Sequence, residues 1–277
     1  MKKLPPQILL SLRALAFYLL LFRREWLETL WFQLPYLPFI PFFDQIPTGL
    51  FCLPLIVIVY LAPFAILLNY RAALAARCLG IGLLLSLLSS MPLFGNSKCF
   101  LACLFLLGGS YQVGGWIYQM QLFLLYFGAG LNKLLQADWW NGYYFDFFAA
   151  EVFELAGYRY LTQYVDALLV AKISGILILL FELLLGLLFC FRAQIGLAIF
   201  LGFSFHVLML LLSWGYLSFH FFFVSSVAYY LLFSTTKQSV GFGNKWMRNN
   251  LNIRLMTVLW VCFLLLQLGA EKWRYAW

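Results

Sequence analysis

Charged residues are scarce in this sequence of 277 amino acids. Lys, Arg, Asp and Glu together make up 10% of it, whereas hydrophobic residues make up 65%. Soluble globular domains carry roughly 25% charged residues, so the composition argues against a soluble domain and predicts a chain that lies mostly in lipid. A polar block long enough for a second domain is also missing. The sequence therefore predicts one transmembrane domain over residues 1–277.

Motifs with a fixed catalytic or metal-binding spacing are missing as well. The six cysteines lie mostly in apolar runs and form no CxxC or Cys/His pattern, so no metal site is predicted. Neither a Ser/His/Asp triad nor a glycine-rich phosphate loop is evident. The net charge of +8 comes mostly from single Lys and Arg residues at the ends of apolar runs, where snorkelling and the positive-inside rule place them. This pattern predicts membrane lipid, and not nucleic acid, as the partner.

Long apolar runs are what the sequence has in abundance. A helix needs about 20 apolar residues to cross a membrane, and the sequence predicts an all-α, polytopic bundle of about nine transmembrane helices (8–10). The expected spans are residues 7–22, 48–68, 73–92, 99–112, 115–136, 167–191, 193–213, 214–233 and 252–270.

Two longer connections between these runs are rich in aromatic residues. Residues 25–47 contain four prolines, which forbid a regular helix, so we expect a loop that lies on the membrane. A polar turn is expected over 92–98. Residues 137–165 combine aromatic and acidic side chains, which predicts short interfacial helices over the mouth of the bundle.

Loop charges predict the orientation. Arg71, Arg77, Arg192 and the basic stretch 237–254 fall on one side if all nine runs cross. Positive loops are cytoplasmic, so the N-terminus is expected inside and Lys133 outside. Two arginines, at positions 23 and 24, fall on the opposite side.

Ionisable side chains within apolar runs mark the candidate sites. Such groups are costly in a membrane unless they are paired, hydrated or used. Arg13, Glu182 and His206 are equally compatible with a buried structural network and with a chemical role. For Lys172, near a span end, we favour snorkelling, and for His220 a local structural role.

Lys133 stands apart because of its surroundings. It follows the small residues Gly128-Ala129-Gly130 and precedes Asp138-Trp139-Trp140-Asn141-Gly142. Burial disfavours the charged form of an amine, and a neutral amine can act as a general base or nucleophile. The alternative is a Lys that snorkels past Trp139 to the headgroups.

The block AGLNKL at 129–134, with Ala137-Asp138-Trp139 and Gly142, is similar to a family signature. It resembles the horizontally transferred transmembrane domain, which is the membrane domain of vitamin K-dependent gamma-glutamyl carboxylase and its bacterial relatives. Arg13, the series Glu182, Arg192 and His206, and the aromatic run 219–223 agree with the family in order. The family's upstream His has no counterpart in residues 95–98, and a large lumenal domain is not expected.

The resemblance implies a lyase-like, peptide-modifying activity on an exported peptide in a bacterial inner membrane. Lys133 would be the general base, with His206 and Glu182 as further catalytic residues. Arg13, Asp138, Trp139 and Arg192 would bind the ligand, which is implied to be a quinone of the vitamin K hydroquinone type.

Two other functions stay open at this point. Some bacterial relatives lack carboxylase activity, and one group resembles the sporulation-delaying toxin maturation protein B. The chain could therefore be a non-catalytic subunit or scaffold for peptide toxin maturation, with a partner protein. A proton-coupled transporter with Glu182 and His206 ranks last, because no inverted repeat is evident.

Overall fold

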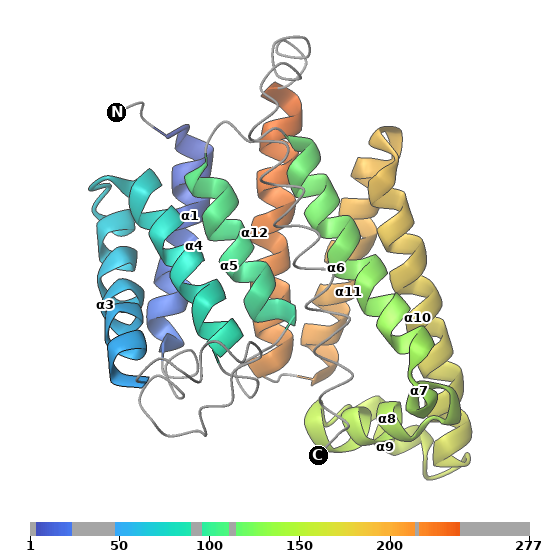
Figure 1. Ribbon diagram of the computed structural model, residues 1–277. Coiled ribbons are helices and arrows are strands. Elements are labelled where there is room, and N and C mark those ends of the chain that lie inside the picture. The colour runs from blue at the N-terminus through green and yellow to red at the C-terminus, as the bar shows by residue number, and fades with distance from the viewer. Residues whose placement is uncertain (1–3, 24–47, 90–95, 111–114, 214–215, 239–277) are drawn as a thin grey trace. The chain divides into compact units, whose positions relative to one another are not determined.

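Helices make up every described element of the structure. The computed structural model describes residues 4–23, 48–89, 96–110, 115–213 and 216–238 (Figure 1). The long helices are α1 (Pro6–Leu21), α3 (Thr48–Leu67), α4 (Ala72–Ser89), α5 (Asn96–Gly109), α6 (Gly115–Leu135), α10 (Ala167–Cys190), α11 (Ile195–Ser213) and α12 (Tyr216–Gln238).

The predicted all-α class is confirmed over this part of the chain. Eight of the nine apolar runs are helical, and the ninth, 252–270, lies outside the described residues, as does the expected loop 25–47. Two predicted boundaries were wrong. The helix α5 already begins at Asn96, so Asn96–Lys98 is its first turn and not a polar turn. The helix α12 runs on to Gln238, so Lys237 belongs to a helix and not to a basic loop.

Two described helices are both long and apolar enough to cross a membrane. They are Ala167–Cys190, with 24 residues, and Arg192–Ser213, with 22 residues. Five other apolar helical stretches in the described part of the chain are shorter, with 10–17 residues. Length and composition therefore indicate membrane association through α10 and α11.

Exposed side chains on α10 support the same conclusion. Large apolar residues are exposed every three or four positions along this helix, which places them on one face: Leu169, Ile173, Leu177, Leu180, Leu184 and Leu187. Soluble proteins rarely expose a contiguous apolar stripe of this length. The stripe is suited to contact with lipid.

Contacts divide the chain into two compact units. The first contains α1, α3, α4 and α5, together with the end of α12 from Tyr230. In it, α4 packs against α3 and α5, and α1 contacts the same two helices. Its buried side chains are mostly apolar, such as Leu12, Leu83 and Phe105.

The second unit contains the candidate site. It comprises α6, α10, α11 and α12 as far as Tyr229, and the short elements between α6 and α10. These are α7 (Ala137–Asn141), α8 (Tyr143–Phe147), the π-helical turn η3 (Phe148–Val152) and α9 (Ala156–Leu161); a 3-10 turn, η4 (Arg192–Gln194), precedes α11. Short helices between 137 and 165 were predicted, and the structure contains them.

Candidate functional site

An ion pair joins Lys133 to Glu182 within the second unit. Lys133 lies in the last turn of α6, and its Nζ is 2.8 Å from Oε1 and 2.6 Å from Oε2 of Glu182 on α10. The first distance lies in the range of charge-assisted N–H···O hydrogen bonds, about 2.7–2.9 Å, and the second is slightly shorter. The ammonium therefore donates to both oxygens of one carboxylate.

Close packing of α6 on α10 brings the two charges together. A Cβ added at Gly130 would lie 2.9 Å from Leu183 Cδ2, and a Cβ added at Gly186 would lie 2.7 Å from the backbone N of Phe127. At both points the neighbouring helix occupies the space of a side chain. Small residues of this kind let helix backbones approach closely, and Lys133 and Glu182 meet on the two helices that approach in this way.

Burial makes this pair electrostatically significant. The exposed fractions of the Lys133 and Glu182 side chains are 18% and 11%. Removing either charge from water is costly, and a partner at hydrogen-bond distance offsets that cost. Transfer of one proton from Nζ to a carboxylate oxygen would give a neutral amine and a neutral acid with no change in net charge. The two residues can therefore exchange a proton with each other.

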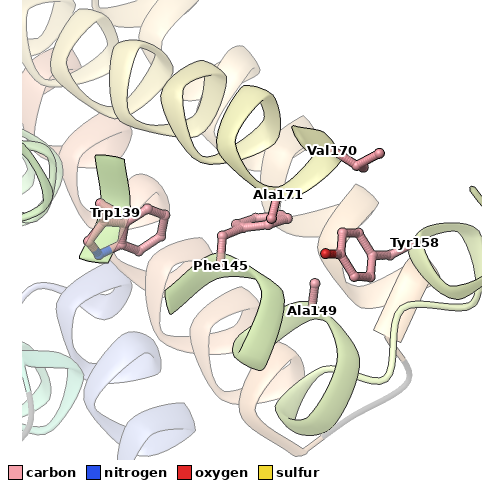
Figure 2. Close-up of a cluster of buried hydrophobic side chains, with 6 residues drawn as sticks. All are labelled: Trp139, Phe145, Ala149, Tyr158, Val170 and Ala171. Atoms are coloured by element: carbon pink, nitrogen blue, oxygen red, sulfur yellow. The ribbon is translucent and has the colours of Figure 1, made fainter. Parts of the chain in front are cut away.

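Trp139 lies beside the pair and is held by a separate cluster. Lys133 Nζ is 5.0 Å from the centre of a Trp139 ring, within the range of a cation–π interaction. The ring also packs near Gly175 of α10. Figure 2 shows Trp139 at one end of a buried cluster that also contains Phe145, Ala149, Tyr158, Val170 and Ala171. This cluster attaches the short elements α7 to α9 to the beginning of α10.

Asp138, although next in sequence to Trp139, points elsewhere. Its side chain is exposed and accepts a hydrogen bond of 3.4 Å from Asn141 Nδ2. The indole N–H of Trp140 donates to the carbonyl of Leu134 at 2.9 Å, which ties α7 to the end of α6. The structure thus brings Lys133 and Trp139 together and leaves Asp138 on the exposed side of α7.

His206 belongs to a second polar cluster. Its Nε2 is hydrogen-bonded to Tyr126 Oη at 2.7 Å, and the same hydroxyl is hydrogen-bonded to Tyr229 Oη. All three residues are buried. A Cβ at Gly202 would collide with the Tyr229 hydroxyl, so the glycine makes room for it. Tyr126 lies two helical turns before Lys133, about 10 Å along α6.

Sequence reasoning missed both tyrosines. The hypothesis of an Arg13–Glu182–His206 network did not anticipate the observed partners, since Glu182 pairs with Lys133 and His206 pairs with Tyr126. Tyrosine is common here, with 16 copies, and neither Tyr126 nor Tyr229 sits in a distinctive pattern. A helical spacing of Tyr126 and Lys133 on one face of α6 is the signal that could have pointed to Tyr126.

The two arginines of the sequence hypothesis belong to other elements than the two residues of this ion pair. Arg192 is the first residue of η4, beyond the end of α10. It is ten residues from Glu182, which corresponds to about 15 Å along the axis of α10. Arg13 lies in α1 of the first unit, where its Nε is buried without a hydrogen-bond partner among the described residues. The second unit thus builds its site from Lys133, Glu182 and Trp139.

Comparison with known proteins adds no family. No family model, curated protein or solved structure matches the chain. Among the described residues, no group of three or more His, Cys, Asp or Glu side chains could hold a metal ion. The function must therefore be argued from the Lys133–Glu182 pair and its surroundings.

Proposed function

We propose that the chain is a polytopic membrane protein of about nine spans that modifies or matures an exported peptide. Lys133 and Glu182 are its proton-transfer pair. The observation that carries the proposal is the contact of Lys133 Nζ with both carboxylate oxygens of Glu182, at 2.8 and 2.6 Å, in a largely buried position. The resemblance of residues 129–142 to the carboxylase membrane domain supports the peptide as substrate.

The pair handles a proton in two steps. Lys133 first passes a proton to Glu182, which leaves a neutral amine beside a neutral acid. The amine then accepts a proton from an acidic O–H or C–H group of the ligand. The resulting ammonium is paired with the ligand anion, while Glu182 remains protonated. Trp139, 5.0 Å from Nζ, limits the directions from which the ligand can approach.

A quinone is the cofactor that the resemblance implies. A ring of this type needs a hydrogen-bond donor for its oxygen and an apolar wall. The ammonium of Lys133 and the indole of Trp139 are groups of these kinds. When bound, a reduced quinone would supply the acidic O–H group.

A non-catalytic role in peptide toxin maturation, or as a scaffold, is the second candidate. The observation that favours it is that each charge of the pair already satisfies the other. A buried ion pair of this kind can have a purely structural role, in which it fixes the register of two helices. On this view, the protein would hold a partner protein or a short peptide at the membrane.

In both cases the protein is proposed to lie in a bacterial inner membrane. Its N-terminus would be cytoplasmic, and the Lys133 end of α6 would face outward. Arg192 then lies at the cytoplasmic end of α10, while the acidic residues 138–166 lie at the outer end.

A paired substitution separates the two candidates. Lys133→Met/Glu182→Leu replaces the ion pair by apolar groups, a change that is often neutral for stability. We expect the purified variant to stay within about 1 kcal/mol of the wild type in unfolding free energy but to produce no modified peptide. The readout is the mass spectrum of peptides exported by cells that carry each variant. Native mass spectrometry of the wild-type protein would identify a bound ligand or partner.

Lys172→Met is the matched control, because Lys172 is an exposed lysine on the same helix as Glu182. It should leave peptide modification unchanged. Full modification by the Lys133→Met/Glu182→Leu variant would overturn the catalytic proposal and favour the scaffold. Loss of modification on Lys172→Met alone would show that the effect of the paired substitution is not specific to the ion pair, and would remove the support for the catalytic proposal.

A further inference from the structure

Residues 137–166 form a short helical collar with an unusual outer surface. The collar comprises α7, α8, η3, α9 and the turn that leads to α10. Large aromatic and apolar side chains are exposed on it: Trp140, Tyr143, Phe147, Val152, Tyr160, Leu161, Tyr164 and Val165. A folded domain in water rarely exposes so many within 30 residues, and patches of this kind mark contact surfaces.

The opposite side of the collar is fixed to α10. Its buried cluster includes Val170 and Ala171 from the first turn of that helix (Figure 2). Gly142 has a positive φ of 89°, and a Cβ there would lie 2.9 Å from the carbonyl of Leu168, so only glycine permits this approach. The collar is thereby held as a rigid attachment to the end of a helix that is long enough to span a membrane.

Hydrogen bonds complete this attachment. Tyr158 Oη donates to Asp146 and to the carbonyl of Ala167, and Asp166 caps α10 by accepting from Leu169 N at 2.8 Å. Burial, followed by the hydrogen bond to Asp146, raises the pKa of Tyr158 above its usual range. The phenol therefore stays protonated as a donor at physiological pH.

Along the chain, the exposed collar residues are followed within a few positions by the exposed apolar stripe of α10. Tyr164 is 71% exposed and Val165 is also exposed, and the stripe begins at Leu169. Aromatic residues with a polar tip, Tyr and Trp, are typical of the headgroup level of a membrane. Between these aromatics, the collar has five carboxylates and one guanidinium, a net charge of −4, which disfavours anionic lipids.

We infer that the collar lies in the membrane–water interface, with its exposed aromatic side chains in contact with zwitterionic lipid at the boundary between headgroups and acyl chains. The inference rests on the membrane setting of the proposed function and not on the chemistry of Lys133. We assign lipid as the contact of the outer surface of the collar. The experiment below distinguishes lipid from a peptide or protein bound to that surface.

Spin labels at single cysteines in phosphatidylcholine vesicles test this placement. In a background free of the six native cysteines, labels go to Phe147 and Tyr164 in the collar, to Leu177 in the middle of α10, and to the exposed Glu151. Power saturation compares access of oxygen, which dissolves in lipid, with access of a water-soluble nickel chelate. We expect the ratio of oxygen to chelate access to be highest at Leu177, intermediate at Phe147 and Tyr164, and lowest at Glu151.

Each other pattern overturns the inference in a distinguishable way. Phe147 and Tyr164 labels as open to the chelate as Glu151 would place the collar in water. Labels closed to both reagents would show a protein or peptide on the surface. Chelate access at Leu177 as well would remove the membrane setting itself, and with it the basis of the proposed function.

A second measurement uses tryptophan fluorescence of the protein with its native cysteines retained. It compares the neighbours Trp139 and Trp140, which are 7% and 40% exposed. Lipids brominated near the headgroup should quench part of the protein's fluorescence. Trp140→Phe should reduce that quenched part, whereas Trp139→Phe should not. Equal quenching in the wild type and the Trp140→Phe variant would contradict the inference.

Discussion

Tyr126 is the residue at which α6, α11 and α12 meet through hydrogen bonds. Its hydroxyl contacts both His206 Nε2 and Tyr229 Oη, and its ring stacks at 5.9 Å on Phe189 of α10. One side chain therefore makes contacts with three other helices of the second unit. In a low-dielectric interior such a network is stabilising only when every member is satisfied.

Removal of that hydroxyl tests its importance. Tyr126→Phe leaves His206 Nε2 and Tyr229 Oη without this partner while keeping the ring. We expect the free energy of unfolding to fall by about 1–3 kcal/mol, the usual cost of an unsatisfied buried polar group. Tyr230→Phe, at an exposed tyrosine, is the control and should change stability by less than about 0.5 kcal/mol. Thermal or denaturant unfolding in detergent measures both, and equal effects would contradict the role given to Tyr126.

At the scale of elements, the contact between α6 and α10 decides where the candidate site forms. Gly130 and Gly186 each face the other helix at a distance that excludes a side chain, and Gln119 Nε2 of α6 donates to the carbonyl of Phe189 of α10. These contacts fix the register of the two helices over several turns. Lys133 reaches Glu182 because of that register.

A single methyl group should disturb this register. In Gly186→Ala the new Cβ would meet the backbone N of Phe127 at 2.7 Å, and a backbone cannot yield as a flexible side chain would. We expect a loss of about 1–3 kcal/mol in unfolding free energy, as for other overpacked interiors, together with reduced peptide modification.

Gly196→Ala in α11 is the matched control, because a Cβ there meets nothing within 4 Å. Alanine is the better helix former by up to about 1 kcal/mol, so this variant should be neutral or slightly more stable. If both variants behave alike in the unfolding measurement, the close approach of α6 and α10 does not set the register.

For the whole molecule, charge is distributed unequally along the second unit. The collar carries five of the ten acidic residues of the chain and lies at one end of α10, while Arg192 lies at the other end. Positively charged connections stay on the cytoplasmic side. The proposed orientation places the acidic collar outside and the connection between α10 and α11, with Arg192, in the cytoplasm.

Labelling with a maleimide that cannot cross membranes tests this orientation. Cysteine is introduced in the cysteine-free background at Glu154 in the collar or at Ala193 in η4, both of them exposed. In intact spheroplasts, the Glu154→Cys protein should be labelled and the Ala193→Cys protein should react only after permeabilisation. The reverse pattern would place the collar in the cytoplasm and remove the exported peptide as a substrate.

Prediction from sequence was most successful where the signal is local. Apolar runs define helices such as α10 and α11, and acidic and aromatic residues mark the collar, because each depends on neighbours in the chain. The Lys133–Glu182 contact depends instead on how Gly130 and Gly186 pack between two helices, which no spacing along the chain records. Tyr126 and Tyr229 were missed for the same reason, since their partners lie 80 or more residues away.

The separation of Lys133 and Glu182 also has a consequence during synthesis. They are 49 residues apart, so at about 5–20 residues per second the ribosome completes Lys133 about 2–10 s before Glu182. Throughout that interval the ammonium at the end of α6 lacks the carboxylate of Glu182, its partner in the folded protein, and the collar is the segment made in between. In the proposed membrane setting, the ion pair that joins α6 to α10 therefore forms only after the collar and the first part of α10 have been made.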